Sequence, residues 1–586
     1  MKLLRYLKGY LKESILGPFF KLLEAAFDLL IPLVMADIID VGIANKDVNY
    51  IYQMGALIVL IGVLGLVCSI SAQYFAAKAA TGMATSLRSD LFRHIQSLSY
   101  AEMDTIGTST LITRMTSDIN QVQTGVNLAL RLLLRSPFIV FGSMIMAFTI
   151  NVKAALVFVV AIPLLALVVF GVMLVSIPLF RKVQNSLDKV LLHTRENLSG
   201  VRVIRAFNKQ SDERKNFEQA NDELVGQQTF VGRISAIMNP LTYVIINLAL
   251  CVLIWTGAWQ VEGGLITQGE VVALVNYMSQ ILVEMVKMAN LIITINKSLA
   301  CAKRIQAVLD TQPGMKQGSG VAISPSQVQV GEEMVAFDHV SFTYPNASEE
   351  SLSDIHFSAQ KGQTIGIIGG TGSGKTTLIN LIPRFYDATK GSIRIAGEKI
   401  EEYTYEQLRG KIGIVPQKAV LFKGTIAQNL KWGNPQADET QMWKALEAAQ
   451  AQDFVAGKAD GLDAQVLQGG SNLSGGQRQR LTIARALIRE PQILILDDSA
   501  SALDYATDAR LREAIRRLDP QMTVFIVSQR AASIRYADEI MVLDDGQMVG
   551  WGTHEELLSN CTIYQEIYYS QFPKGEQEER GCRAHG

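Results

Sequence analysis

The stretch Gly369–Thr377, GGTGSGKTT, has the residue types and spacing of a loop that binds phosphate groups. It fits the pattern G-x-x-x-x-G-K-[ST], in which glycines let backbone N–H groups turn towards phosphate oxygens. Lys375 is placed to reach the outer phosphates of a nucleotide, and the Thr376 hydroxyl is placed to bind Mg²⁺. We therefore expect ATP and Mg²⁺ to bind here. The expected ATP-binding residues of the loop are Gly369, Gly370, Thr371, Gly372, Ser373, Gly374, Lys375, Thr376 and Thr377.

Two motifs further along the chain belong to the same chemistry. The apolar run Ile493–Leu496 ends in Asp497, as expected of a strand whose carboxylate holds Mg²⁺ directly or through water. The motif LSGGQ places glycines before a basic helical pattern, which makes a second anion site at a helix N-terminus. One ATP does not need two such sites from one chain, so we expect this motif to contact a nucleotide held by another subunit. Its residues are Leu473, Ser474, Gly475, Gly476 and Gln477.

These motifs lie in a segment whose pattern predicts an α/β domain. From Met334 onward, short β-branched runs alternate with helical patterns, which is typical of a parallel core sheet. Tyr344 stands at the end of a strand pattern, where it could stack on a purine or simply pack. We expect the domain at 334–572, after a linker at 310–333 rich in Gly, Pro, Ser and Gln, and before a polar tail at 573–586.

The first half of the chain, residues 1–309, predicts a membrane domain. Hydrophobic residues make up 49% of the chain, mean hydropathy is +0.20, and the apolar excess lies in this half. A helix that crosses a bilayer needs about 20 apolar residues. Three stretches of sufficient length carry no Asp, Glu, Lys or Arg, and three more carry some charge. We expect six helical spans near Ile15–Ile39, Val48–Ala77, Gly125–Ile150, Ala154–Phe180, Ile234–Val261 and Val271–Ile295.

The distribution of Lys and Arg predicts the orientation in the membrane. Basic residues gather at the N-terminus and in the long segments after the second and fourth spans, whereas the alternate loops are short and poor in cations. Both termini and the α/β domain should therefore be cytoplasmic, in a multi-pass plasma-membrane protein of bacterial type. Apolar residues in the long segments have helical spacing, so we expect spans two to five to continue as helices into the cytoplasm. The chain should reverse near Asp104–Ser109 and Ser199–Val203.

Charged residues inside the expected spans are costly and need an explanation. They share helix faces within the first, third and sixth spans. One interpretation is that they line a water-filled pathway and contact the substrate. The other is that they pair with one another or lie outside the lipid, and both interpretations stay open at this point. The residues are Lys21, Glu24, Asp28, Arg131, Arg135, Glu284 and Lys287.

Together these features resemble the ATP-binding-cassette (ABC) exporters. The resemblance rests on the phosphate loop, LSGGQ, Gln417 in IGIVPQ, the SALD turn and the six-span half, and it covers nearly the whole chain. It implies a half-transporter that dimerises, with each ATP held between one chain's phosphate loop and the other chain's LSGGQ. It further implies that Gln417 contacts Mg²⁺ and couples to the membrane half, that Tyr344 stacks on adenine, and that the two reversals are coupling helices. The turn at the dimer interface is Ser501, Ala502, Leu503 and Asp504.

Two positions depart from the pattern of this family. The family has a catalytic Glu after the Mg²⁺-binding Asp497, where this chain has Asp498, and its switch strand ends in His, where this chain has Gln529. Asp is one methylene shorter than Glu, and a misplacement of about 1 Å can cost on the order of 100-fold in rate. Gln can donate a hydrogen bond to a phosphate but carries no positive charge. We therefore expect a chain that binds Mg-ATP, hydrolyses it slowly at its own catalytic positions and donates LSGGQ to a partner.

The expected function is that of one subunit of an ATP-driven exporter, which moves small hydrophobic or amphipathic compounds out of the cell. The chain resembles the degenerate-site subunit of bacterial heterodimeric multidrug exporters, whose partner carries the Glu and the His. The alternatives are a homodimeric lipid or peptide exporter that tolerates Asp498, and a membrane regulator that binds ATP without transporting anything.

Composition excludes other classes of protein. The net charge of −1 and the pI of about 6.6 give no basis for binding nucleic acid, and the five scattered cysteines argue against a disulfide framework or a zinc site. The partners left are membrane lipid, a second subunit and the substrate. The expected fold class is an α-helical six-span transmembrane domain with long cytoplasmic helix extensions, fused to an α/β P-loop NTPase domain.

Overall fold

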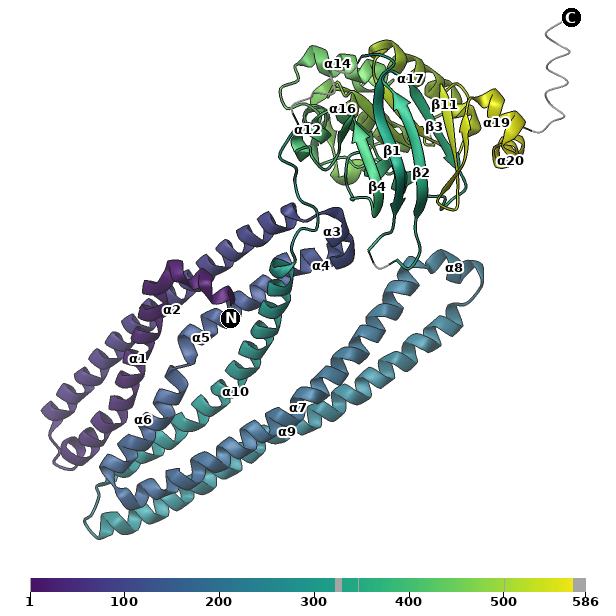
Figure 1. The fold of residues 1–586 in the computed structure, drawn as a ribbon. Helices are drawn as coiled ribbons and strands as arrows, with labels where there is room; N and C mark the ends of the chain where they lie inside the picture. Colours follow the sequence, from purple (N-terminus) through teal and green to yellow (C-terminus); the bar gives the residue numbers. More distant parts are fainter. Residues whose placement is uncertain (1, 322–328, 346, 500, 573–586) are drawn as a thin grey trace, which may run out of the picture. The chain divides into compact units, whose positions relative to one another are not determined.

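The structure is a computed structural model that describes residues 2–321, 329–345, 347–499 and 501–572. The expected polar tail at 573–586 and part of the expected linker lie outside these residues. The chain divides into two compact units (Figure 1). The helical unit comprises Met1–Gln96 and Ser109–Thr311, and the sheet unit comprises Ser97–Thr108 and Gln312–Gly586. The short segment Ser97–Thr108 thus belongs with the sheet unit, although it follows a helix of the helical unit in sequence.

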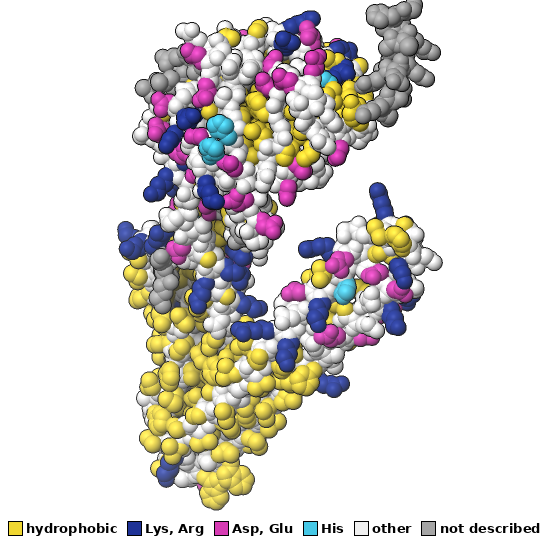
Figure 2. All heavy atoms as spheres, turned by 45° about the vertical axis from the view of Figure 1, so that its right-hand side comes forward, with side chains coloured by type: hydrophobic (Ala, Val, Ile, Leu, Met, Phe, Trp, Pro, Cys, Tyr) yellow, Lys and Arg dark blue, Asp and Glu magenta, His cyan; other side chains and the backbone are white. Residues whose placement is uncertain are grey.

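Long helices build the helical unit, and Figure 2 shows apolar side chains over one part of it and charged side chains over another. α7 and α9 lie side by side along much of their length (Figure 1). α3 (Tyr100–Ile106) belongs to the sheet unit. The other helices up to Asp310 are the 3₁₀ helix Lys2–Tyr10, α1 (Leu11–Asp37), the π-helical Ile38–Ile43, α2 (Val48–Ser97), α4 (Thr108–Thr113), the π-helical Arg114–Asp118, α5 (Ile119–Leu132), α6 (Arg135–Ile150), α7 (Val152–Ser199), α8 (Val201–Ala206), α9 (Gln210–Glu262) and α10 (Gln268–Asp310).

Five helical stretches among the described residues are long and apolar enough to cross a membrane. They are Val48–Ser97, Thr108–Ile150, Val152–Ser199, Gln210–Glu262 and Gln268–Asp310.

The first expected span coincides with α1, which is not among these five stretches because Lys21, Glu24 and Asp28 interrupt its apolar sequence. α1 is nevertheless part of the packed helical unit. Its Leu29 is 6% exposed, and the buried Tyr277 of α10 donates a hydrogen bond to the Leu29 carbonyl over 2.6 Å. The structure confirms a helical transmembrane domain, and the predicted total of six spans depends on counting α1.

The expected continuation of the spans into long helices is confirmed. α2, α7 and α9 contain 50, 48 and 53 residues, far more than the ~20 that cross a bilayer. Short helices, α3 and α8, form the two reversals. A capping box between Ser99 and Glu102 starts α3, and Gly107, with φ of 82°, ends it. The first reversal therefore begins a few residues before the predicted Asp104.

The sheet unit has the expected α/β composition. Its strands are β1 (Glu333–Phe342), β2 (Leu352–Gln360), β3 (Thr364–Gly369), β4 (Lys390–Ile395), β5 (Glu398–Lys399), β6 (Ile412–Val415), β7 (Gly424–Thr425), β8 (Gln465–Val466), β9 (Ile493–Asp497), β10 (Thr523–Val527), β11 (Glu539–Asp544) and β12 (Gln547–Gly552). Its remaining helices of four residues or more are α11 (Lys375–Leu381), α12 (Tyr405–Gly410), α13 (Ile426–Lys431), α14 (Glu439–Ala448), α15 (Gln452–Ala456), α16 (Gly475–Leu487), α17 (Tyr505–Leu518), α18 (Ala531–Ile534), α19 (His554–Asn560) and α20 (Thr562–Gln571).

The core sheet has six strands in the order β12-β11-β3-β10-β9-β6. All neighbours in it are parallel except β11 and β12, which form an antiparallel hairpin. The strand cores are apolar on both faces, as a covered parallel sheet requires. In the register, Val527 pairs with Asp497 on one side and with Ile367 on the other. The segments that follow β3, β9 and β10 therefore emerge at one edge of the sheet, where ligands of open α/β sheets bind.

Candidate functional site

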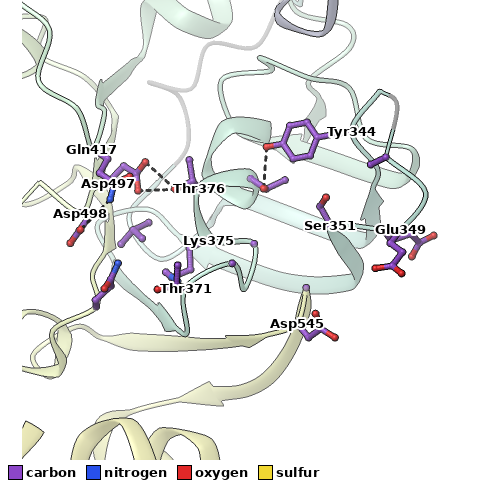
Figure 3. A pocket seen from close by; sticks show the side chains of 18 of the residues that line it. Tyr344, Glu349, Ser351, Thr371, Lys375, Thr376, Gln417, Asp497, Asp498 and Asp545 are labelled. Atoms are coloured by element: carbon purple, nitrogen blue, oxygen red, sulfur yellow. Dashed lines mark hydrogen bonds between the residues drawn. The ribbon is translucent and has the colours of Figure 1, made fainter. Parts of the chain in front are cut away.

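A pocket of about 710 Å³ lies at this edge of the core sheet. In Figure 3, Gln417, Asp497 and Asp498 lie on one side of the phosphate loop and its helix, and Tyr344 lies on the other. The pocket brings together most of the residues that the sequence predicts for ATP binding and hydrolysis. Those that line it are Tyr344, Thr371, Gly372, Gly374, Lys375, Thr376, Thr377, Gln417, Asp497, Asp498 and Gln529.

The phosphate loop joins β3 to α11 and depends on glycine at Gly374. This residue has φ of 92°, and a Cβ atom there would lie 2.8 Å from both Leu352 Cδ2 and the Ser351 carbonyl oxygen. The Lys375 ammonium is buried and donates hydrogen bonds back to the loop. Its acceptors are the Gly369 carbonyl at 3.0 Å, the Gly370 carbonyl at 2.5 Å and Ser373 Oγ at 3.1 Å. Burial lowers the pKa of Lys375, and the charges of Asp498 and Asp497 oppose that effect.

The Thr376 hydroxyl and the Asp497 carboxylate lie close together and supply oxygen atoms that could bind a cation. The hydroxyl donates to both carboxylate oxygens of Asp497, over 3.3 and 3.2 Å (Figure 3). Asp497 ends β9 and is 5% exposed, and burial raises its pKa, although the Thr376 hydrogen bond works in the opposite direction. A hydroxyl, a carboxylate and the nearby Gln417 amide are the hard oxygen donors that Mg²⁺ prefers.

Asp498 stands in the position of the expected catalytic residue. Its carboxylate accepts a hydrogen bond from the Gln417 side-chain amide over 3.4 Å, and burial raises its pKa. Its backbone has φ of 45°, in the left-handed region that Asp and Asn adopt more readily than most residues. The Asp498 N–H donates to the Val527 carbonyl over 2.9 Å, which fixes this backbone against the end of β10.

Tyr344 lies at the side of the pocket away from Asp497. Its hydroxyl is hydrogen-bonded to the Thr377 hydroxyl at 3.1 Å, and its ring meets those of Phe342 and Tyr386 edge to face, with centroids 4.8 and 5.3 Å away. The ring is thus held at the rim of the pocket, as a surface on which a nucleobase can stack. Packing accounts for part of its environment, so the predicted stacking role stays a prediction.

The switch position, Gln529, lines the pocket directly after β10. The side chain of Gln571, at the end of α20, is hydrogen-bonded to the backbone at this position and at the residue two positions further along. Its Nε2 donates to the Gln529 carbonyl over 2.8 Å, and its Oε1 accepts from the Ala531 N–H over 2.9 Å. Arg530 connects the switch segment to the predicted interface turn. Its guanidinium donates to the Ser501 carbonyl over 3.1 Å and to the Leu503 carbonyl over 3.3 Å.

The signature motif does not line this pocket in the part of the chain that the structure describes. Ser474 caps α16: its hydroxyl accepts from the Gln477 N–H at 3.2 Å, and Gln477 Oε1 accepts from the Ser474 N–H at 3.0 Å. The predicted interface turn lies beside it, since a Cβ atom on Gly476 would be 3.1 Å from the Ala502 carbonyl oxygen. Signature and turn thus form one surface, separate from the pocket of the same chain.

The interface turn is tied to the hydrolysis position and to the helix that follows. The Ser501 hydroxyl donates to the Asp498 carbonyl over 2.8 Å. Asp504 caps α17 by accepting from the Thr507 N–H over 2.9 Å. Movement of this turn would therefore reach Asp498 through Ser501.

Six of the seven charged residues predicted inside the spans form a connected cluster in the helical unit. Arg135 donates to Glu284 over 2.6 Å and to Asp28 over 3.0 Å, and its Nη2 is 3.8 Å from Glu24. Lys21 donates to Glu24 over 2.5 Å, and Lys287 donates to Glu284 over 2.9 Å.

These contacts match the interpretation in which the charged residues pair with one another, and a role in substrate transport stays a prediction. The seventh predicted residue, Arg131, has no ion pair to this cluster in the described part of the chain, and its Nε is buried without a hydrogen-bond partner.

Sequence reasoning missed several residues of the site. The pocket is also lined by Glu349, Glu350 and Ser351 before β2 and by Asp545 in the β11–β12 turn, and Gln571 and Arg530 hold the switch segment. These positions carry no pattern of their own. Only the tertiary contacts place them near the phosphate loop. The residues present fit a bound Mg-ATP, because the pocket combines a glycine loop, a lysine, an aromatic ring and oxygen donors within one space.

Comparisons with known proteins show the family to which this chain belongs. Residues 14–285 match the family model described as ABC transporter transmembrane region, and residues 352–501 match the one described as ABC transporter. An uncharacterized ABC transporter ATP-binding protein of Mycobacterium tuberculosis is 38% identical over 574 residues, which cover 97% of each chain. The ATP-dependent lipid A-core flippase of Chromohalobacter salexigens is 30% identical over 575 residues, which cover 98% of each chain.

A solved structure shows the same fold. It is a bacterial Atm1-family ABC exporter with ATP bound, which aligns with 98% of this chain and 99% of its own, at a TM-score of 0.74 and 24% identity. Pocket, topology and relatives agree, and the chain therefore belongs to the ABC transporter family, as an exporter half-transporter in which a transmembrane region and an ATPase domain are fused and ATP hydrolysis is coupled to transport.

Proposed function

We propose that this chain is one subunit of a heterodimeric exporter that moves small hydrophobic or amphipathic compounds across the bacterial plasma membrane. The ATPase domain and both termini are on the cytoplasmic side, as the Lys and Arg distribution predicts. The chain binds Mg-ATP at a site that hydrolyses slowly, and it contributes its signature motif to a partner's faster site.

Retention of every binding element supports the first half of this proposal. Lys375 and the loop amides would hold the phosphates, and Thr376, Asp497 and Gln417 would hold Mg²⁺. The ion, when bound, neutralises charge on the phosphates during transfer. These residues are present and close together, so binding should be tight.

Asp498 carries the second half of the proposal. Hydrolysis needs a side chain that orients the attacking water, and a carboxylate retracted by one methylene is misplaced for that task. The left-handed backbone and the Val527 contact leave the main chain little freedom to advance and compensate. Gln417 also engages the same carboxylate.

Gln529 weakens the site independently. A His at the switch can carry a positive charge towards the developing negative charge on the phosphate, whereas a Gln amide offers only a neutral donor. The two hydrogen bonds of the Gln571 side chain hold the backbone at Gln529 and Ala531. The neutral Gln529 side chain therefore stays at the pocket. Two such changes at one site are hard to reconcile with fast turnover.

The intact signature supports a role in a partner's site. Ser474 is fixed as the cap of α16, and Gly476 packs directly against the interface turn. Both features hold the motif in place, where it can contact a nucleotide bound outside the chain's own pocket.

The decisive experiment compares this chain alone with a pair formed with a second exporter subunit that carries Glu and His at the two departed positions. Alone, the chain should bind labelled ATP but show little ATPase activity. In the pair, Ser474→Ala should lower turnover by on the order of 100-fold, because it removes a donor to the transferring phosphate at the fast site. Lys375→Ala in the same pair should lower turnover much less, since it affects only the slow site.

Fast hydrolysis by the chain alone that Asp498→Ala abolishes would overturn the proposal of a slow site. Equal loss from Ser474→Ala and Lys375→Ala in the pair would overturn the proposed asymmetry of the two sites.

A homodimeric lipid exporter is the second candidate, and one observation favours it. A relative that is 30% identical over nearly the whole chain has the name ATP-dependent lipid A-core flippase. If this candidate is correct, the chain purified alone should be a monodisperse dimer whose ATPase activity rises with added lipid and which moves labelled lipid between leaflets of a vesicle. A heterodimer subunit should do none of these without its partner.

A further inference from the structure

A second sheet has four strands in the order β2-β1-β4-β5, and one of three irregularities in the pairing of β1 with β2 lies between Phe337 and Val340. Phe337 pairs with Phe357 and Val340 with Ile355, so two residues of β1, Asp338 and His339, face the single His356 of β2. This is a β-bulge, which re-aims side chains that would otherwise alternate between faces. His339 has φ of 50°, a conformation that is uncommon for residues other than glycine. The bulge therefore presents Asp338, His339 and His356 on the same exposed side of the sheet.

The three side chains are close enough to share one ion. One ligand atom of each lies within 4.8 Å of the ligand atoms of the other two. The imidazole rings of His339 and His356 are stacked with centroids 5.0 Å apart, and His356 Nδ1 is 3.8 Å from Asp338 Oδ1. Figure 2 shows histidine side chains exposed side by side among acidic and basic ones on the sheet unit.

A fourth residue orients one of the rings. Asp354 Oδ1 is hydrogen-bonded to His339 Nδ1 at 2.6 Å, which leaves Nε2 of that ring as the ligand atom. Asp354 is itself held in place, because its N–H donates to the Ser341 hydroxyl over 3.1 Å and its backbone has φ of 51°. Metal-binding histidines commonly use such a carboxylate to fix the tautomer and the ring.

We infer that Asp338, His339 and His356 form a binding site for one divalent transition-metal ion of the Zn²⁺ class, with Asp354 as the residue that orients His339. Two imidazoles and one carboxylate, with a position left for water, suit Zn²⁺ better than Mg²⁺, which prefers oxygen ligands. The ion would join β1 to β2 across the bulge. The site shares no residue with the ATP pocket and does not depend on the proposed function.

One cation competes for the same carboxylate. Arg394 of β4 has its Nη1 3.9 Å from Asp338 Oδ2, and its Nε is 3.8 Å from Glu333. The arginine thus faces one oxygen of Asp338, and the other faces His356. With Asp354 nearby, the cluster keeps two carboxylates against this one guanidinium, so a divalent ion is not repelled. None of the three ligands is a cysteine, so the spacing of the cysteines in the sequence does not indicate this site.

The experiment titrates purified full-length protein with Zn²⁺ in nucleotide-free and Mg²⁺-free buffer, against a competing fluorescent chelator. The wild-type chain should bind one ion that His339→Ala with His356→Ala removes. Asp354→Asn should keep the site but weaken it by about tenfold or more, as expected when an orienting carboxylate is lost. His193→Ala, on α7, is the matched control and should leave the affinity unchanged.

Three results would overturn the site. They are a stoichiometry that the paired histidine substitution does not change, the absence of any ion bound by the wild-type chain, and an equal loss of affinity in the His193→Ala control. Cu²⁺ used as a spectroscopic probe gives a second readout, since nitrogen hyperfine coupling from two imidazoles should disappear in the paired variant. All of the substituted side chains are at the surface or partly exposed, so circular dichroism should confirm that each variant is folded.

Discussion

The Tyr386 hydroxyl donates a hydrogen bond to Asp104 Oδ2 over 2.6 Å, which ties the reversal helix α3 to the loop after α11 within the sheet unit. The ring of Tyr386 also meets Tyr344 at the rim of the nucleotide pocket, with centroids 5.3 Å apart. Tyr100 of α3 packs on the neighbouring Phe385, with centroids 4.6 Å apart. One residue therefore contacts both the expected nucleobase platform and the helix that follows the second span.

Tyr386→Phe should separate ATP hydrolysis from transport. The substitution keeps the ring against Tyr344 and removes only the hydrogen bond to Asp104, which is worth about 1 kcal/mol. Burial and the Asp104 contact raise the pKa of Tyr386, so the hydroxyl stays a donor over the whole neutral range. We expect a lower number of substrate molecules moved per ATP hydrolysed in vesicles. Asp104→Asn, which keeps an acceptor oxygen, should have the smaller effect, and equal coupling in all three proteins would contradict the role of this bond.

Asp498→Glu combined with Gln529→His should restore hydrolysis to the chain's own site. The longer carboxylate would regain its reach, and the imidazole would return a group able to carry positive charge. We expect a rise of about tenfold or more in the ATPase rate of the chain alone. Asp498→Glu alone should give less, because Gln529 would still offer only a neutral donor to the phosphate. A double variant as slow as the wild type would show that other residues limit the site.

Gln571→Ala should loosen the switch segment without touching the nucleotide. The side chain bonds the Gln529 carbonyl and the Ala531 N–H but does not line the pocket. Hydrogen exchange of the amides at 529–534 should speed up, while the affinity for labelled ATP stays within error. Gln565→Ala is the matched control, since Gln565 lies on the same helix and its side-chain amide donates to the Leu558 and Ser559 carbonyls, away from the switch segment. Faster exchange in the control variant too would assign the effect to α20 as a whole.

The sequence predicts those parts of the site that depend on residues close together in the chain. It does not predict the parts that depend on contacts between residues far apart in the chain. Local periodicity predicts the long helices, and motif spacing predicts the residues from Gly369 to Thr377 as well as Asp497. The Tyr386–Asp104 bond joins residues 282 positions apart, and the Gln571–Gln529 bond joins residues 42 positions apart. Such contacts depend on the packing of whole elements, which no local pattern encodes.

The bulge at His339 is a similar case. The apolar alternation along β1 shifts by one residue between Phe337 and Val340, but only the pairing of β1 with β2 shows that Asp338 and His339 lie opposite His356. α1 shows the opposite limit. Two of the charges that make it a poor span by composition, Glu24 and Asp28, face Arg135 of α6, which also pairs with Glu284 of α10. Burial by partners, rather than its own hydropathy, accounts for its place.

Mg²⁺-dependent ATP binding should fade on acidification earlier than an exposed Asp would titrate. Burial raises the pKa of Asp497 above its ordinary value of 3.8, so it takes up a proton at a higher pH and then loses its affinity for the cation. The free energy of unfolding changes in the opposite direction. The folded chain takes up a proton on Asp497 more readily than the unfolded chain does, so acidification favours the folded state through this group. The loss of Mg²⁺-dependent ATP binding at low pH is therefore not a sign that protonation of Asp497 unfolds the chain.

The measurement for this prediction is the affinity for a fluorescent ATP analogue with Mg²⁺ and with a chelator, from neutral pH downward. The difference between the two should shrink at a pH above 3.8. Asp497→Asn should show little difference at any pH. A difference that persists in full down to the ordinary Asp range would contradict the raised pKa.

Asp28→Asn should change which substrates are transported if the charged cluster of the helical unit lines the pathway. Asp28 is the most accessible acid of the cluster, with its side chain 36% exposed, whereas Glu24 is 12% and Glu284 4% exposed. It can therefore meet a cationic substrate while Glu284 stays engaged with Arg135 and Ser136. Loss of its charge should lower transport of a cationic dye relative to a neutral dye of similar size in vesicles. Glu13→Gln is the matched control, because Glu13 is on the same helix but pairs with Lys78 outside the cluster. An unchanged ratio of the two dyes in Asp28→Asn, with the protein folded, would leave the cluster with a structural role only.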